Sequence, residues 1–431
     1  MGWYQSAMLA AAVGIVVFVP RLAPFLLALL VLTLAVDDRG RFRGIVTWLS
    51  ASRPLWAIAA FALWAMISAL WSASARETWD AAGLLVVTML FGAYASASLA
   101  MRGDGMTASW RQRFLRAAPL ALAVGAGFLL VELVANAGVT LSVLRNWPQL
   151  AGDRGKGVLL AEGQATGLAR EYFNRNVAAL VLLCFPALAA GWLWLAPPWR
   201  LRLAVPLVVA VAVATASSES ETAKLALVTG LAVLALAWRW PEHARRGLGV
   251  VLALGLLLAP VLARLPVALG LEHTTLLPAS ARSRLLIWDY TGEAIWRHPL
   301  HGIGVRSTKA AQQKLVDSGQ SAKALQSARR PGSHAHNVFL QVWFELGAIG
   351  ALLLCAGGLA LLARLRGLNG PIQAFGAAYA GTMIVASATG WGAWQEWYMA
   401  CTALSLTILA LCVSLATGGP SGASGGNEPR V

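Results

Sequence analysis

The residues best suited to chemistry in this sequence are two histidines, His334 and His336, in a polar stretch just before an apolar one. Histidine exchanges a proton near neutral pH without needing a shifted pKa. A neutral imidazole at this point could accept the proton of an attacking hydroxyl group, which is typically worth ~10²- to 10⁴-fold in rate. The neighbouring Asn337 could orient the imidazole or bind substrate. Either histidine could act, and the alternative is that both are surface residues.

A basic, Trp-containing segment precedes the histidines and could bind an anionic substrate. Residues 279–298 have mixed polarity and predict a helix outside the membrane, in which Arg284 and Trp288 are four positions apart and share a face. The planar guanidinium of Arg284 can hold a phosphate with several donors, which a lysine would copy poorly. In the alternative interpretation, Arg284 only forms a pair with Asp289 or Glu293.

Three further cations are candidates for binding a phosphate or a glycan. Arg175 opens an apolar segment, where a charge is costly and indicates a site by default; its alternative is snorkelling to lipid headgroups. Lys224 lies just inside another apolar segment and needs a partner, either Glu221 or a ligand phosphate. Arg306, in the same basic stretch as Arg284, is the third candidate.

The elements that must position these residues are membrane helices. The chain has 431 residues, of which 58% are hydrophobic and 12% charged, with a mean hydropathy of +0.65. This composition excludes an ordinary soluble domain. About twelve apolar runs approach the ~20 residues that cross a membrane as a helix, so we predict an all-α polytopic membrane protein. The runs are 7–20, 22–36, 54–72, 81–101, 116–138, 174–196, 203–217, 222–238, 247–268, 336–363, 371–391 and 396–416.

Arginines in alternate short loops predict the orientation of these helices, with both termini in the cytoplasm. Two long connections, 139–173 and 269–335, then lie outside. The stretch 264–335 carries ten basic residues against four acidic ones. Such an excess outside the membrane favours an anionic ligand such as phosphate, diphosphate or an acidic glycolipid. Contact with anionic lipid headgroups is the alternative, and nucleic acid is not an expected partner.

A single transmembrane catalytic domain is predicted over 1–416, followed by a disordered, Gly- and Ser-rich cytoplasmic tail over 417–431. The four cysteines lie in apolar runs, which predicts a packing role. No Cys/His spacing is typical of a zinc site, and no acidic pair is typical of a divalent-metal site. A reaction without metal or other cofactor is therefore expected.

An ordered run of short motifs gives the sequence a family resemblance. The motifs are Arg284-x-x-x-Trp288, Pro299-x-x-Gly302-x-Gly304, His334-x-His336-Asn337-x-x-Leu340 and Glu345-x-Gly347-x-x-Gly350. Together they resemble the signature of bacterial O-antigen ligases, of O-antigen polymerases of the same superfamily, and of O-linked oligosaccharyltransferases. The spacing of Gly347 and Gly350 in an apolar run predicts close helix packing.

The resemblance implies a GT-C-type membrane bundle with one large periplasmic loop between its ninth and tenth helices. It implies metal-independent, inverting transfer of a glycan from undecaprenyl diphosphate on the periplasmic face of the inner membrane. The family's motif arginine maps onto Arg284, its motif histidine onto His336 with His334 as the alternative, and the arginine before the sixth helix onto Arg175. Relatives often have Ser-Arg where this chain has Ser220-Glu221, and Lys224 is the replacement we expect.

Among these activities the compact motif favours an O-antigen ligase, whose acceptor is the lipid A-core oligosaccharide. The expected partners are thus the lipid-linked O-antigen, the lipid A-core and membrane lipids, with no obligate protein partner. The alternatives are the polymerase and the protein O-oligosaccharyltransferase. A secondary transporter is the alternative from another class, but internal repeats and mid-membrane charges would then be expected.

Overall fold

The chain forms a helical bundle, described here from a computed structural model that covers residues 3–38, 40–102, 107–147, 157–161, 164–317, 330, 332–368 and 370–417. The predicted tail after Thr417 lies outside the described residues. The first half contains α1 (Trp3–Phe18), α2 (Ala23–Asp37), α3 (Phe42–Ser50), α4 (Arg53–Ile67), α5 (Ala75–Arg102), α6 (Ala108–Val134), α7 (Gly138–Asn146), β1 (Val158–Ala161), β2 (Gln164–Leu168), α8 (Asn174–Trp194) and α9 (Pro197–Ala216). The second half contains α10 (Glu221–Arg239), α11 (Pro241–Leu257), α12 (Ala259–Leu262), α13 (Leu265–Ala268), α14 (Ala279–Ala294), α15 (Ser307–Asp317), α17 (Val338–Ala363), α18 (Gly370–Thr389) and α19 (Glu396–Thr417).

Each predicted apolar run is helical, which confirms a polytopic helical membrane protein. Within the described residues, nine helical segments are long and apolar enough to cross a membrane, or ten if α11 and the following α12–α13 form one bent span. Of the remaining two runs, α1 is apolar but short, and α18 is not among those nine. A count of twelve crossings therefore stays a prediction.

The departures from the predicted pattern lie outside the long helices. Two short strands, β1 and β2, form an antiparallel hairpin in the predicted loop 139–173, so the chain is not purely helical. The ninth run is broken at Leu258, and the pieces on its two sides are bent by 69°. Pro260 lies just after the break and lacks the N–H group that a continuous helix would use, which explains why the helix breaks there.

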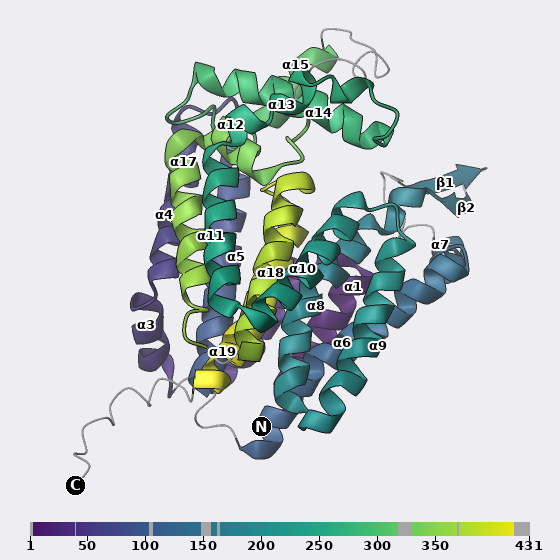
Figure 1. Ribbon diagram of the computed structural model, residues 1–431, viewed down its shortest axis with the longest axis vertical. Coiled ribbons are helices and arrows are strands. Elements are labelled where there is room, and N and C mark those ends of the chain that lie inside the picture. Colours follow the sequence, from purple (N-terminus) through teal and green to yellow (C-terminus); the bar gives the residue numbers. More distant parts are fainter. Residues whose placement is uncertain are drawn as a thin grey trace.

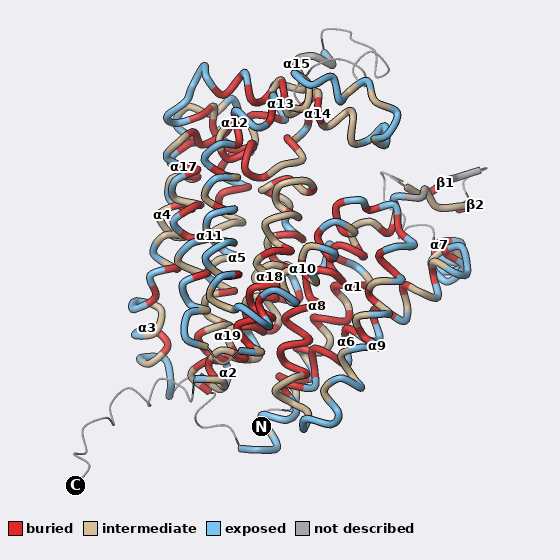
Figure 2. Tube along the Cα trace, in the orientation of Figure 1, coloured by how far each residue is buried: buried red, intermediate tan, exposed pale blue. Residues whose placement is uncertain are grey.

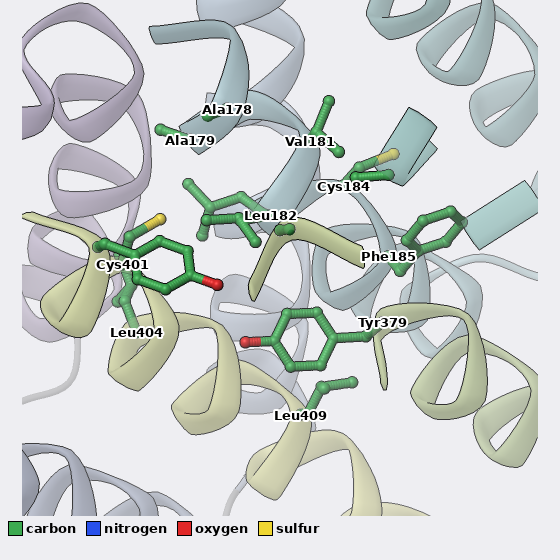
Figure 3. Close-up of a cluster of buried hydrophobic side chains, with 14 of the residues drawn as sticks. Ala178, Ala179, Val181, Leu182, Cys184, Phe185, Tyr379, Cys401, Leu404 and Leu409 are labelled. Atoms are coloured by element: carbon green, nitrogen blue, oxygen red, sulfur yellow. The ribbon is translucent and has the colours of Figure 1, made fainter. Parts of the chain in front are cut away.

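The core is centred on α8, whose membrane-length window is 83% buried (Figure 2). Its residues Leu182 and Phe185 pack between α18 and α19, near Tyr379 and Cys401 (Figure 3). Gly230 of α10 approaches Phe185 so closely that an added Cβ would lie 2.3 Å from its ring. All four cysteines are buried, as their apolar runs predicted.

The two ends of the bundle differ in character. At one end, α19 meets α5, where Ser414 Oγ donates to the Ala100 carbonyl at 2.8 Å. The buried Arg102 and Asp38 form an ion pair of 2.5 Å beside it. The opposite end carries α12 to α15 (Figure 1). The predicted basic short loops fall at the first end, and both long connections reach the second, as the alternation of helices requires.

Candidate active site

The two histidines lie side by side at the end of the bundle that carries α14. Their ring centroids are 4.0 Å apart and the ring planes are inclined by 41°. His336 has a φ of 52°, a left-handed conformation that is uncommon for a residue with a side chain. Such strained residues persist where the surrounding contacts hold them, and they cluster at functional sites.

Hydrogen bonds define which ring nitrogen of His336 carries the proton. Its Nδ1 lies 3.2 Å from the carbonyl oxygen of Gly390, an atom that can only accept. The proton of the neutral ring is therefore on Nδ1, and Nε2 keeps its lone pair. This tautomer is the one that a proton-accepting imidazole needs.

His334 is held differently. Its Nε2 lies 3.5 Å from the side-chain amide nitrogen of Gln395, whose oxygen accepts from Trp397 Nε1 at 2.8 Å. Gln395 therefore presents an N–H group to His334, and the lone pair on His334 Nε2 accepts this hydrogen bond. The other ring nitrogen lies 3.2 Å from the hydroxyl of Ser333. The ring packs on Gly392, where an added Cβ would lie 2.9 Å from His334 Cδ2.

Both histidines are neutral at physiological pH. Burial lowers the pKa of His336 to about 3, helped by His334 and the positive charge of Arg284. Burial, Arg284 and Arg175 lower the pKa of His334 to about 4. The same arginines that would attract an anion therefore keep the imidazoles in the form that accepts protons.

Arg284 and Trp288 lie on the same face of α14, as their spacing predicted, and Trp288 contacts the histidine segment. Arg284 Nη1 donates to the Thr389 carbonyl at 2.8 Å and faces Thr222 Oγ1 at 3.4 Å, so it links α14 to α18 and α10. Trp288 Nε1 donates to the Ala335 carbonyl at 2.8 Å, between the two histidines in sequence. Burial lowers the pKa of Arg284, but a guanidinium stays charged.

The alternative pairing partners of Arg284 face another arginine. Asp289 and Glu293 lie 3.6 and 4.0 Å from Arg264, just after the break between α11 and α12. These contacts join α14 to the residue between α12 and α13.

Arg175 lies at the same end, in the first turn of α8. Its neighbour Asn176 donates to the carbonyls of Val17 and Phe18 at 2.9 and 2.7 Å, which ties the start of α8 to the end of α1. Arg175 is close enough for its charge to lower the pKa of His334. The structure thus brings Arg284, Arg175 and both histidines together from segments far apart in sequence.

The glycine motifs form a backbone contact that we call the glycine clasp, made by residues 299–304 and 344–349. Ile303 and Gly304 donate N–H groups to the carbonyls of Phe344 and Glu345 at 3.0 and 2.8 Å. In return, Ala348 donates to the Pro299 carbonyl at 2.8 Å. The clasp joins the loop after α14 to an interruption within α17.

Two glycines make the close approach of the clasp possible. An added Cβ at Gly302 would lie 2.4 Å from the Glu345 carbonyl carbon, and one at Gly347 would lie 2.3 Å from the Leu300 carbonyl. Gly347 also has φ 67° and ψ −166°, a conformation open essentially to glycine alone. The expectation that Gly347 serves helix packing is therefore wrong, because the chain leaves the helical conformation there.

Glu345 is a buried residue of this site that the motif analysis left without a role. Its carboxylate accepts hydrogen bonds from the Thr308 hydroxyl at 2.5 Å, the Arg306 backbone N–H at 3.0 Å, the Gln341 amide at 3.4 Å and Trp394 Nε1. It joins α17 to the loop after the clasp and to the segment before α19. An acidic residue in an apolar run was the signal that could have identified it.

The remaining candidates have defined places. Asn337 caps α17, since its Oδ1 accepts from the Leu340 N–H at 3.1 Å. Lys224 Nζ pairs with Glu221 at 2.9 Å, and both side chains are partly exposed. Arg306 lines a cavity of about 130 Å³ together with His334.

These features define a class: a polytopic membrane protein with a basic, histidine-containing site where its helices end. Residues 206–355 match a family described as O-antigen ligase. This match covers 150 of the 431 residues and supports an O-antigen ligase-type protein, as the motifs predicted. The match includes Arg284, the clasp and both histidines, whereas Arg175 lies before it. No curated protein shows a significant match to the chain.

Proposed function

We propose that this protein is an O-antigen ligase of the bacterial inner membrane. It transfers preassembled O-polysaccharide from undecaprenyl diphosphate to the lipid A-core oligosaccharide on the periplasmic face. The observation that carries this proposal is the lone pair on Nε2 of His336, which accepts no hydrogen bond from the part of the chain that the structure describes, beside the charges of Arg284 and Arg175. A proton acceptor next to a binding place for diphosphate is the arrangement that this transfer requires.

In the proposed reaction, the acceptor hydroxyl attacks the anomeric carbon of the first sugar of the donor. The new carbon–oxygen bond forms as the bond to the diphosphate oxygen breaks, and that oxygen leaves with the electron pair. The hydroxyl proton passes to His336 Nε2. Arg284 and Arg175 stabilise the charge that develops on undecaprenyl diphosphate. Direct displacement inverts the anomeric centre, and the arginines supply the charge that a metal ion would otherwise provide.

Donor binding would also adjust the histidine. The charge of Arg284 is among the causes that lower the pKa of His336. A diphosphate bound at Arg284 offsets that charge, so the pKa of His336 rises when the donor is present. The base therefore gains strength when there is a substrate to transfer.

The other candidates act in support. Trp288 and Asn337 position the histidine segment through their bonds to Ala335 and Leu340. Lys224 is proposed as a further contact of the diphosphate, in place of the family's arginine; its partly exposed pair with Glu221 costs little to exchange. We further propose a GT-C-type bundle with both termini in the cytoplasm and the α14 end in the periplasm.

The test is complementation of a ligase-deficient strain that already makes lipid-linked polymer. Wild type, His336→Ala and the control His273→Ala are compared at matched membrane levels; His273 has 84% of its side chain exposed and lies outside the site. Wild type and the control should restore long O-chains on the lipid A-core, and His336→Ala should not. A core left bare by wild type would reject ligation and direct attention to polymerase or protein-glycosylation assays.

A further inference from the structure

A second basic site lies beside the histidine pair. It is the cavity of about 130 Å³ already noted, whose wall includes Arg306, Lys309, Gln341, Gln395 and His334. A water molecule takes roughly 30 Å³ of liquid volume, so the cavity holds about four waters, or one small charged group with its surroundings. It is too small for a polysaccharide, but it fits a single substituent of one.

Arg284 does not line the cavity, and its guanidinium bonds to Thr389 and Thr222 instead. His334 forms part of the cavity wall, and the tilted ring of His336 packs against that of His334. His336 in turn bonds to Gly390, and the adjacent carbonyl of Thr389 accepts from Arg284. The cavity and the proposed diphosphate site at Arg284 therefore use different cations beside the same histidine pair.

The cations of the cavity are placed to meet an anion. Arg306 has φ 60° and donates its backbone N–H to Glu345, so a strained backbone fixes the start of its side chain. Within the described parts of the chain, no carboxylate forms an ion pair with its guanidinium. Lys309 pairs with Glu77 at 2.9 Å, but their side chains are 59% and 36% exposed. Such an exposed pair exchanges partners at little cost.

One carboxylate also forms part of the wall. Glu345 would repel an anion, but both of its oxygens already accept hydrogen bonds, two each. An anionic group would therefore bind toward Arg306 and Lys309, away from Glu345. Gln395 contacts both the cavity and His334, and brings the bound group next to the histidine pair.

We propose that this cavity is the acceptor subsite, and that it binds an anionic group, phosphate or carboxylate, carried by the acceptor glycan. The inference rests on the proposed function. In a direct displacement, the attacking hydroxyl and the leaving diphosphate lie on opposite sides of the anomeric carbon. The acceptor therefore needs a binding site of its own, apart from that of the diphosphate at Arg284 and Arg175. The cavity is a basic site next to the histidine pair, and Arg284 is not among the residues that line it.

The experiment measures transfer by full-length protein in proteoliposomes, with a lipid-linked donor and core acceptors that keep or lack their phosphates. Arg306→Gln is compared with Arg306→Lys and with Arg297→Gln, an exposed arginine of the same region. A lost charge-assisted hydrogen bond should raise the KM for the phosphorylated acceptor by ~10- to 100-fold. The KM for the donor and kcat should change little, Arg306→Lys should recover part of the loss, and Arg297→Gln should match wild type.

The two acceptors identify the anionic group. If removing the phosphates raises the wild-type KM and abolishes the effect of Arg306→Gln, the group is a phosphate. If the phosphate-free acceptor keeps its dependence on Arg306, the group is a carboxylate. Wild-type transfer whose acceptor KM is indifferent to Arg306, or an effect on the donor KM alone, would overturn the subsite. An absence of wild-type transfer to either acceptor would overturn the proposed ligase function itself.

Discussion

The substitution Gly347→Ala offers a direct test of the glycine clasp. Its added Cβ would lie 2.3 Å from the carbonyl carbon and oxygen of Leu300 and 2.5 Å from the His301 nitrogen. These are backbone atoms, so no side-chain rotation relieves the overlap. The conformation of φ 67° and ψ −166° costs an alanine ~1–3 kcal/mol. Forced repacking adds another ~1–3 kcal/mol. We expect a total loss of roughly 2–6 kcal/mol, a large part of the ~5–15 kcal/mol that stabilises a typical protein.

The matched control is Gly357→Ala in the same helix. Its Cβ would meet Ile58 at 3.4 Å, an ordinary contact, in a helical conformation that favours alanine over glycine by up to ~1 kcal/mol. The assay heats each variant in detergent and measures the monodisperse fraction and glycan transfer. The monodisperse fraction and the transfer activity of Gly347→Ala should be lost at a lower temperature than those of wild type, and those of Gly357→Ala should not. Gly302→Ala should act like Gly347→Ala, with a double variant less affected than the sum because both disrupt one contact. If Gly347→Ala behaves like Gly357→Ala in both measurements, the clasp does not hold the site.

Two further predictions concern the histidine segment. Trp288→Phe keeps an aromatic ring but loses the donor to Ala335, so it should cost ~0.5–1.5 kcal/mol and reduce transfer several-fold; unchanged transfer would show that this bond does not position the histidines. Because the pKa of His336 is about 3 in the folded protein and 6.5 in the unfolded one, the neutral ring's contribution to stability is present above pH 6.5 and is lost as the pH falls toward 3. At about pH 5 that loss should be roughly 2 kcal/mol. As the pH is lowered, the unfolding temperature should therefore fall less in His336→Gln than in wild type. Because the pKa of His336 is about 3, a plot of kcat/KM against pH should not fall with a midpoint near pH 6.5. Such a fall in wild type would contradict the buried setting of the ring.

The sequence predicted the helices and the grouping of the cations, because both depend on local patterns. Apolar runs identify membrane helices by length alone, and the run 174–196 differs from α8 by two residues at its end. The four-residue spacing of Arg284 and Trp288 was enough to place both on one face of α14. The convergence of Arg175 and Arg284 followed from the alternation of the helices across the bundle.

The features that were missed depend on contacts between distant backbones. Gly347 lies in a strongly apolar run, so its pattern is that of a packed helix, and only the approach of residues 299–304 shows why the helix is interrupted there. The four partners of Glu345 come from three separate segments, which no periodicity reveals. The tautomers of His334 and His336 depend on Gln395 and Gly390, more than fifty positions away.

The clasp also separates what must stay fixed in this protein from what is free to vary. It holds the chain just after α14 through hydrogen bonds between main-chain N–H and carbonyl groups, which do not involve side chains. Trp288 holds the returning chain at Ala335. The cavity side chains of Arg306 and Lys309 lie between these two anchors, so their substitution can alter what the surface recognises without displacing the histidines. A protein built in this way can acquire a new acceptor while its reaction stays the same.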